Sequence, residues 1–312
     1  MTRYVGRRLV DAVLTILLVL TLVFVAMRVL PGDPAAAALG DMATPEQLAA
    51  FRVRLGLDQP IAVQYAIFLW HMLRFDFGRS FVTNESTLGL LAQNLPYTLQ
   101  LAAAAMVVGA VIGIPAGVVA ATRRGAWADY LARGLSLAGF CVPEFYLGAL
   151  LLIVFALKLN LLPIMDGGSG PLDRLSHLVL PACTLGLLMG AFACRLTRSA
   201  MLEVLRKDYV RTAKAKGAPR RVVIYHHALR NALIPIITGF GIDILTMLSG
   251  SISVELVFSR PGLGSVLVNG ILSRDYPVVQ ASLVLFALLV VVVNVVMDLL
   301  YAVVDPRIRV TA

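Results

Sequence analysis

Long apolar runs separated by polar segments are the dominant pattern along this chain. Each run is long enough to cross a hydrocarbon core, which needs about 20 residues. The runs lie at 9–30, 97–121, 135–159, 178–200, 234–258 and 281–304. Lipid offers no hydrogen-bond partner to an open backbone, so each run is predicted to be a helix. The pattern therefore predicts an all-α membrane protein with six transmembrane helices.

The composition supports this interpretation. The 312 residues are 59% hydrophobic and 14% charged, whereas water-soluble domains are only about 45–50% apolar. The apolar excess is therefore expected to face lipid. The first run is too long for a signal-peptide core, and Pro31-Gly32-Asp33-Pro34 follows it in place of a small-residue cleavage site, so we expect it to remain as an anchor.

Basic residues predict the orientation. Most of the 27 lysines and arginines lie before the first run or after the second, fourth and sixth runs. The positive-inside rule assigns such segments to the cytoplasm, so both termini, at 1–8 and 305–312, are predicted to be cytoplasmic. The net charge of +9 is then explained by topology, and no nucleic-acid partner is expected.

The outer segment 31–96 is too long for a bare loop. Its Thr-Pro-Glu-Gln stretch at 44–47 is typical of a capping box and predicts a short helix that ends at Gly56. A second helix is expected from Pro60. It is apolar and rich in aromatic residues but too short to span, which is typical of a helix at a membrane interface.

Three glycines recur at four-residue spacing in the second run. Gly109, Gly113 and Gly117 share one helix face, where small residues let another helix approach closely. We interpret them as a helix-packing seam. The alternative is that glycine is simply common in membrane helices.

The cationic segment between the fourth and fifth runs has the start and stop signals of two helices. One is predicted over 201–216, with Gly217 as its left-handed stop, and a second leads from Pro219 back to the membrane. A lysine or arginine at the bilayer centre costs about 2.5–3.5 kcal/mol. The hairpin 201–233 is therefore expected to stand in the cytoplasm.

Small residues at Ala213 and Ala215 leave room for close approach, so we interpret this hairpin as a docking surface for a cytoplasmic partner. Two alternatives are open. One is a loop that only retains positive charge, and the other is a helix-turn-helix that reads DNA, which the membrane runs on both sides disfavour.

Enzyme and metal motifs are missing from the sequence. It contains no G-x-x-x-x-G-K-[ST], H-E-x-x-H or G-x-S-x-G. Cys141, Cys183 and Cys194 fall inside apolar runs, which favours small buried residues over a disulfide framework. The adjacent His226 and His227 would point to different faces of a helix, which disfavours a metal site. We expect no enzymatic activity, no bound cofactor and no metal in this chain.

A series of ordered motifs carries a resemblance to a known family. The motifs are "YVGRRL", "LPGDP", "LGLDQP", "FGRS", "DYVRTAKAKG", "HALRNALIP", "ELVFSRPGLG", "RDYPVVQ" and "DPRIR". Together they resemble the inner-membrane permease subunit of a bacterial ABC importer, in the dipeptide, oligopeptide and nickel permease family. The likeness covers essentially the whole chain and implies a type I ABC importer-like fold in the bacterial plasma (inner) membrane.

The resemblance implies a role for the cationic hairpin. The segment corresponds to the family's EAA loop, a coupling helix that inserts into a groove on an ATP-hydrolysing subunit. Its residues are Tyr209, Val210, Arg211, Thr212, Ala213, Lys214, Ala215, Lys216 and Gly217. Arg211-Thr212-Ala213 stand where many importers have Glu-Ala-Ala, so one acidic contact is missing here.

The resemblance also implies partners and a cargo. A second homologous permease, two ATP-binding subunits that hold ATP and Mg, and an extracytoplasmic solute-binding protein are expected, together working by alternating access. Short peptides are the expected substrate, with nickel, a metal chelate or a glutathione-like solute as the alternative. A proton-coupled secondary transporter is the alternative class, although it predicts more buried acids and internal repeats.

Polar residues inside the runs are the candidates for the translocation path, because an ionisable group there is costly unless it faces water or the bundle interior. They are Glu144, Asp243, Asn294 and Asp298. Hydrogen bonding between helices is the alternative role for each of them.

The segment between the fifth and sixth runs starts with a Pro-Gly turn and continues as a short, partly apolar stretch. It is a candidate outer gate that dips into the membrane, with Glu255 at its base and Pro261, Gly262 and Gly264 at its start. A surface hairpin is the equal alternative.

Overall fold

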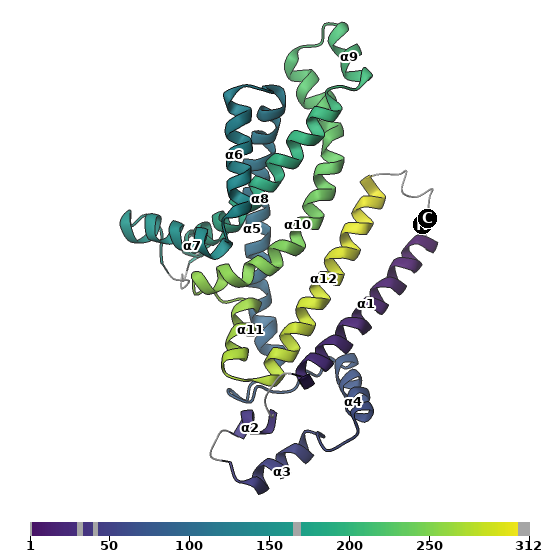
Figure 1. Cartoon of the computed structure of the whole chain (residues 1–312), viewed down its shortest axis with the longest axis vertical. Helices are drawn as coiled ribbons and strands as arrows, with labels where there is room; N and C mark the ends of the chain where they lie inside the picture. The colour runs from purple at the N-terminus through teal and green to yellow at the C-terminus, as the bar shows by residue number, and fades with distance from the viewer. Residues whose placement is uncertain (1, 30–33, 40–42, 165–169, 305–312) are drawn as a thin grey trace. The chain divides into compact units, whose positions relative to one another are not determined.

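The computed structural model describes residues 2–29, 34–39, 43–164 and 170–304, and within these ranges the named elements are all helices (Figure 1). Their bounds are α1 Thr2–Val29, α2 Pro34–Leu39, α3 Pro45–Arg54, α4 Ile61–Leu73, α5 Thr87–Thr122, α6 Trp127–Cys141, α7 Glu144–Leu151, π-helical η1 Leu152–Lys158, α8 Pro171–Val204, α9 Asp208–Ala215, π-helical η2 Val222–Leu229, α10 Arg230–Val257, α11 Leu263–Leu272 and α12 Tyr276–Val304. The predicted cytoplasmic tail 305–312 lies outside the described residues.

Helices long and apolar enough to cross a membrane are found where the sequence predicts apolar runs. Five are continuous: Val10–Arg28, Thr87–Thr122, Leu175–Val204, Val222–Val257 and Tyr276–Met297. Two more helical pieces, α6 and α7 with η1, pass the same test only when they are taken together, and they are bent by 107°, so the described chain has five such helices, or six if this pair is one span. The all-α, multi-span fold predicted from the sequence is therefore confirmed for the described residues.

The expectation of one continuous helix over 135–159 is wrong. The chain leaves the helix at Val142, which has extended backbone angles (φ −90°, ψ 120°), and resumes at Glu144 after Pro143. Proline has no N–H to donate, and its ring disfavours the helical conformation of the residue before it. Both effects act at Val142 and Pro143, so the local sequence favours a break at this point.

A second correction concerns the helix predicted over 201–216. It is interrupted at 205–207, so that α8 ends at Val204 and α9 begins anew at Asp208. Lys207 has extended backbone angles (φ −68°, ψ 147°) and precedes the new helix. Asp208 then places a negative charge at the positive end of the α9 dipole, which favours a fresh start there.

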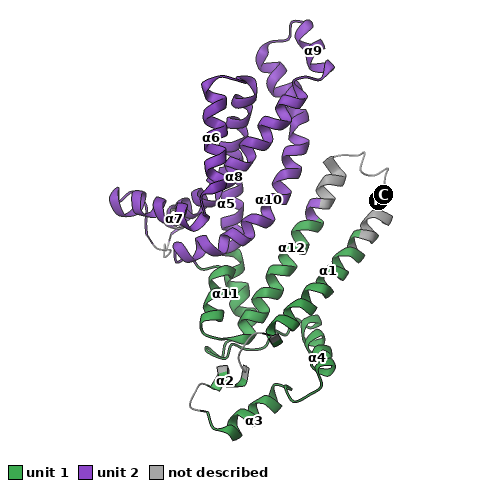
Figure 2. Ribbon diagram, viewed as in Figure 1, with its two compact units in different colours: residues 1–96, 261–295 green, residues 97–260, 296–312 purple. Residues whose placement is uncertain are grey.

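The chain divides into two compact units (Figure 2). Unit 1 comprises residues 1–96 and 261–295, and unit 2 comprises residues 97–260 and 296–312. Unit 1 holds the short helices of the outer segment, and unit 2 holds most of the long helices together with α9.

In unit 1 the predicted capping box is confirmed. The Thr44 side chain accepts a hydrogen bond from the Gln47 N–H, and the Gln47 side chain accepts one from the Thr44 N–H, which opens α3 at Pro45. Gly56 adopts a left-handed conformation with φ +66° just beyond the helix end. The second short helix follows Pro60 as α4.

Aromatic contacts join α4 to α1 in unit 1. The ring of Phe24 lies 5.2 Å from that of Tyr65 and 5.5 Å from that of Phe68, between ring centres. The Thr21 and Tyr65 hydroxyls are 2.6 Å apart and form a hydrogen bond. The short helix α4 is thus held by α1 through both ring packing and a hydrogen bond.

Two carboxylates in unit 1 accept hydrogen bonds from residues in its turns. Buried Asp275 accepts hydrogen bonds from the Ser80 hydroxyl and, at 3.1 Å, from the Phe81 N–H. These bonds connect the outer segment to the turn before α12. Asp76 accepts from the Gly78 N–H at 3.1 Å, and this bond together with His71 lowers the pKa of the Asp76 carboxyl.

In unit 2 the glycine face of α5 lies against α8. An added Cβ at Gly109 would lie 2.9 Å from the Met189 Cβ. At Gly113 it would lie 2.5 Å from the Gly190 carbonyl oxygen, and at Gly117 2.6 Å from the Cys194 carbonyl oxygen. Contacts this short leave no room for a methyl group, so the two helix backbones approach as closely as small-residue seams allow.

The seam predicts that Gly113→Ala destabilises unit 2. The new methyl group would clash with the backbone of α8, and overpacking of this kind costs about 1–3 kcal/mol. Gly134→Ala on α6 is the matched control, because nothing lies within 4 Å of an added Cβ there. Thermal unfolding in detergent should show a lower midpoint for Gly113→Ala alone. Equal midpoints for the two variants would contradict the seam.

Candidate functional site

The hairpin between α8 and α10 is the most distinctive polar feature of unit 2. Figure 1 shows α9 at the tip of this unit, beyond the ends of the long helices. A turn at 205–207 connects it to α8, and η2 leads from it into α10. A short helix is thus attached directly to two membrane-crossing helices.

One face of α9 is fixed in an apolar cluster. Val210 is fully buried (0% exposed) and packs in the same cluster as Val118 of α5, Met201 of α8 and Val223 of η2. Ala213, three residues further along the same face, is half-buried against this cluster. Burial of a valine side chain contributes about 1.5–3 kcal/mol. The helix is therefore anchored to its neighbours.

The other face of α9 is exposed and cationic. Tyr209, Arg211, Thr212, Ala215 and Lys216 are all exposed. Arg211 lies 3.6 Å from Asp208, but both side chains are largely in solvent, where such pairs contribute at most about 1 kcal/mol. The exposed surface thus remains available to an acidic or small-residue partner.

α9 is followed by a glycine, Gly217, in the left-handed backbone conformation. Gly217 has φ +78° and donates its N–H to the Lys214 carbonyl at 3.0 Å. Ala218 donates to the Ala213 carbonyl at 3.2 Å, so the last carbonyls of the helix are satisfied. Nothing lies within 4 Å of an added Cβ at Gly217, so the constraint is on the backbone alone.

A hollow of about 400 Å³ lies between the hairpin and the end of α5. Lys214 and Arg220 line it on the hairpin side, and Ala121 and Thr122 line it on the α5 side. Lys214 therefore faces back toward the membrane helices, unlike Arg211 and Thr212. The sequence pattern alone did not separate these two faces.

The candidate path residues are distributed over several elements. Glu144 is half-buried at the start of α7, directly after the break in the third span. Its Oε1 lies 3.3 Å from the position of an added Cβ at Gly250 of α10, so this glycine leaves room for the carboxylate. Asp243 is half-buried on α10 and Asn294 is exposed on α12. The side chain of Asp298 lies outside the described residues.

The candidate gate residues form two separate groups. Glu255 is fully buried in α10 and accepts a hydrogen bond from the Thr98 hydroxyl at 2.7 Å, within unit 2. Pro261 precedes α11, Gly262 caps it with its N–H donating to the Ser265 hydroxyl at 3.1 Å, and Gly264 is buried in its first turn, within unit 1. Whether this segment enters the membrane stays a prediction.

One buried ion pair was missed by the sequence patterns. The Asp129 carboxylate on α6 accepts hydrogen bonds from Arg198 of α8 at 2.6 and 3.1 Å and from the Gly125 N–H at 3.0 Å. Arg133 lies 3.6 Å away. The four-residue spacing of Asp129 and Arg133 is a sequence signal for an ion pair on one helix face. No sequence signal indicates the pairing of Asp129 with Arg198, which is 69 residues away.

Comparison with known families gives two matches that together cover most of the chain. Residues 1–102 match the N-terminal domain of binding-protein-dependent transport system membrane components. Residues 113–310 match the family described as the binding-protein-dependent transport system inner membrane component.

Curated relatives and solved structures are consistent with these matches. A protein of Brucella abortus named as a peptide transport system permease is 41% identical over 99% of both chains. A glutathione transport system permease protein of Salmonella typhimurium is 40% identical, again over 99% of both. A chain of the MetNI methionine ABC transporter in an inward-facing conformation has a TM-score of 0.57 at 20% identity, covering 71% of this chain and 99% of that one.

The Asp129 and Arg198 pair generates a stability prediction. Asp129→Asn should lower the thermal midpoint in detergent, because breaking a buried pair typically costs about 3–5 kcal/mol. The loss here should lie at the lower end of that range, because the Arg198 side chain is 21% exposed. Glu203→Gln, which breaks an exposed pair with Lys207, is the control. The double variant Asp129→Asn with Arg198→Gln should lose less than the sum of the single losses, and strict additivity would contradict the pairing.

Proposed function

The chain belongs to the family of binding-protein-dependent transport system inner membrane components, and from this premise we propose that α9 is the element through which an ATP-hydrolysing partner drives it. The chain is a permease subunit of an ABC importer and a multi-pass inner-membrane protein. Family membership also removes the proton-coupled secondary transporter from the candidate functions.

A single observation carries the proposal, namely the division of α9 into a buried and an exposed face. Val210 holds the helix to α5, α8 and η2, while Arg211 and Thr212 face outward. A displacement imposed on the exposed face must therefore carry the buried cluster with it, because close-packed side chains transmit strain. The helices attached at both ends of the hairpin, α8 and α10, would move as a consequence.

The partners in this proposal are those that the machinery requires. Two ATP-binding subunits hold ATP and Mg, a second homologous permease supplies the other half of the pathway, and an extracytoplasmic solute-binding protein delivers the solute. ATP hydrolysis takes place on the partners, and this chain is the transmembrane subunit. A ligand shifts a conformational equilibrium only through its differential affinity for the two states, so ATP must bind the closed ATPase pair more tightly than the open pair.

We place the pathway beside the broken third span. Glu144 begins α7 immediately after the bend, and Gly250 of α10 leaves space for its carboxylate. Discontinuous helices with polar groups at the break are common at substrate sites of transporters, because irregular backbone is tolerated where it lines a cavity. Asp243, half-buried on α10, is the second candidate on the same helix as Gly250.

Short peptides are the proposed cargo. The support comes from relatives named as peptide transport permeases that align over nearly the whole chain. Glutathione is the second candidate, because a relative with that printed function is almost as similar in sequence. Both are small peptide-like solutes, so the same pathway chemistry suits either.

The coupling role predicts that Gly217→Val abolishes peptide uptake while leaving membrane insertion intact. A β-branched side chain is strained at φ +78° and would reorient the end of α9. Gly56→Val is the matched control, since Gly56 has φ +66° and equally open surroundings but lies in the outer segment. Uptake and co-purification of the ATP-hydrolysing subunit are measured together. Normal uptake by the Gly217 variant would refute the coupling role.

The cargo proposal predicts ATP-dependent uptake of a labelled tripeptide by the importer reconstituted with its binding protein, second permease and ATP-hydrolysing subunits. An excess of unlabelled peptide should suppress this uptake by more than tenfold, whereas glutathione should suppress it weakly. Strong uptake of labelled glutathione, with no competition by ordinary peptides, would instead select the second candidate. Arg124→Gln, in an exposed turn, serves as a variant expected to transport normally.

A further inference from the structure

One side of the short helix α4 is apolar and exposed. Val63, Ala66, Trp70 and Leu73 follow one another at three- and four-residue spacing, which places them on one helix face, called here the apolar face of α4. All four are exposed, Trp70 by 54% and Leu73 by 75%. A surface helix that faces water has polar residues on its exposed side. The apolar face of α4 therefore has the wrong chemistry for contact with water.

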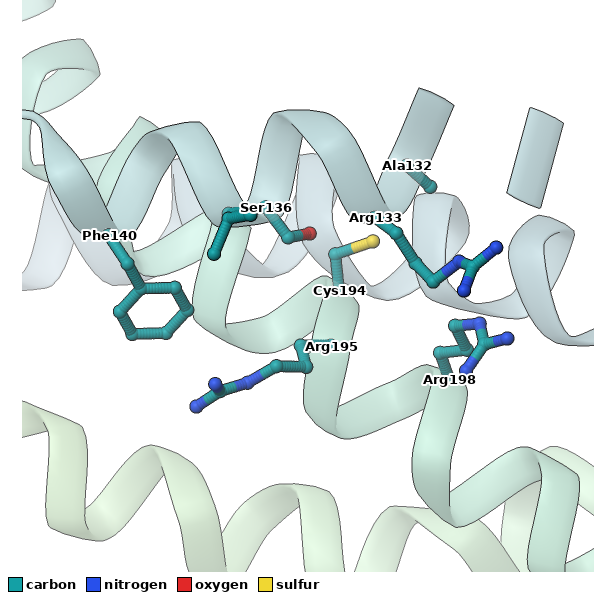
Figure 3. A pocket seen from close by; sticks show the side chains of 8 residues that line it. Ala132, Arg133, Ser136, Phe140, Cys194, Arg195 and Arg198 are labelled. Atoms are coloured by element: carbon teal, nitrogen blue, oxygen red, sulfur yellow. The ribbon is translucent and has the colours of Figure 1, made fainter. Parts of the chain in front are cut away.

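Exposed apolar side chains are also found beside the groove of about 280 Å³ between α6 and α8 (Figure 3). Arg133, Arg195 and Arg198 line this groove together with Leu137 and Phe140. Both helices belong to candidate membrane spans, where an exposed leucine or phenylalanine is expected to contact lipid. α4 has only 13 residues and is too short to cross, so its apolar face requires a contact of another kind.

The polar side chains Gln64 and His71 lie on the opposite side of α4. The Gln64 amide donates to the Leu57 carbonyl at 3.2 Å and to the Gln59 carbonyl at 2.8 Å. His71 Nδ1 lies 2.9 Å from Asp76 Oδ2. Gln64 and His71 also line a hollow of about 620 Å³ within unit 1. The polar side of α4 thus faces protein and its apolar side faces outward, which is the reverse of a helix packed on a water-soluble domain.

The contacts between α4 and α1 place α4 at the depth of a membrane span. α1 contains the candidate span Val10–Arg28. Its Thr21 hydroxyl is hydrogen-bonded to Tyr65 of α4, and its Phe24 ring packs against Phe68 of α4. At 1.5 Å per residue, Thr21 lies about 10 Å and Phe24 about 6 Å before the end of this span. Helices at a membrane interface bury their apolar face to a depth of about 5–10 Å, which matches these positions.

The end of α4 has the chemistry of a headgroup region. The Arg74 guanidinium lies over the Trp70 ring, 4.2 Å from its centre. Tryptophan is enriched where membrane meets water, and a long arginine side chain can cover apolar surface while its charged end stays in water. With the predicted orientation, this end of α1 and the helix packed on it lie in the outer leaflet.

We propose that the apolar face of α4 contacts the acyl chains of the outer leaflet, with Arg74 at the level of the headgroups. Lipid suits this face better than another helix does, because helix seams in membranes are built from small residues and Trp70 and Leu73 are large. The contact would hold the outer segment against the membrane at a point between its two ends, at α1 and α5. The proposal goes beyond the coupling and cargo proposals and depends on neither.

The first test places a photoreactive amino acid at position 70 of the assembled importer, in nanodiscs of phosphatidylethanolamine and phosphatidylglycerol. Illumination should attach a phospholipid to this position, which mass spectrometry of the intact chain detects. Val53 on α3 is the matched control position, because it is 62% exposed in the same outer segment but has arginines as its chain neighbours. Lipid adducts at position 70 should exceed those at position 53 about tenfold.

A second measurement uses the fact that the chain has only two tryptophans, Trp70 and Trp127. Trp127→Phe leaves Trp70 as the single tryptophan, and Trp127 is 72% exposed, so its replacement should leave the packing intact. In vesicles containing the full-length chain, brominated acyl chains should quench the Trp70 fluorescence. Aqueous iodide should quench it about fivefold less than it quenches free tryptophan.

Three results would overturn the proposal. Iodide quenching as strong as that of free tryptophan would place Trp70 in water. An adduct between position 70 and the second permease would identify the apolar face as a subunit interface, and an adduct with the solute-binding protein would identify it as a docking surface for that partner. These readouts need no transport, so failure of this proposal is distinguishable from failure of the coupling role.

Discussion

Contact between the backbones of α5 and α8 is possible only because Gly109, Gly113 and Gly117 have no side chains. A methyl group at Gly113 would lie 2.5 Å from a carbonyl oxygen of α8, so the two helices are as close as their backbones permit. Lipid chains are as apolar as leucine side chains, so helix association in a membrane depends on packing of this kind. The seam holds α8 beside α5, and α9 packs against both helices through Val210.

Two polar pairs inside unit 2 connect helices and thereby define their positions. Asp129 and Arg198 link α6 to α8, and Glu255 and Thr98 link α10 to α5. A buried polar group without a partner costs more than its hydrogen bond contributes, so each of these links favours one arrangement of helices over its alternatives. Arg195 differs, because its guanidinium lies over the Phe140 ring.

The proposed coupling role and the packing of unit 2 depend on the same cluster of side chains. Val210 and Ala213 are part of the packing that includes α5, α8 and η2, while the opposite face of α9 remains exposed. A motion of this helix is therefore shared with the spans to which it is joined. Ala215 leaves room for close approach on the outside, whereas Ala213 faces the cluster. Gly217 ends the helix with a backbone conformation that other residues rarely adopt.

Features that depend on a few neighbouring residues were determined by the sequence. The capping box of Thr44 and Gln47 follows from hydrogen bonds that act over three positions, and the long apolar spans follow from continuous runs of about 20 apolar residues. Proline shows where this reasoning ends. Pro181 and Pro235 lie inside continuous helices, whereas Pro143 separates α6 from α7 by a bend of 107°.

Only the tertiary structure decided between these outcomes, since neighbouring helices determine whether the freed backbone groups are satisfied in place. The partner of Asp129, the side of α9 that is buried and the groove beside Arg195 were likewise hidden from the sequence. Each depends on residues that are distant along the chain and meet only when the helices pack.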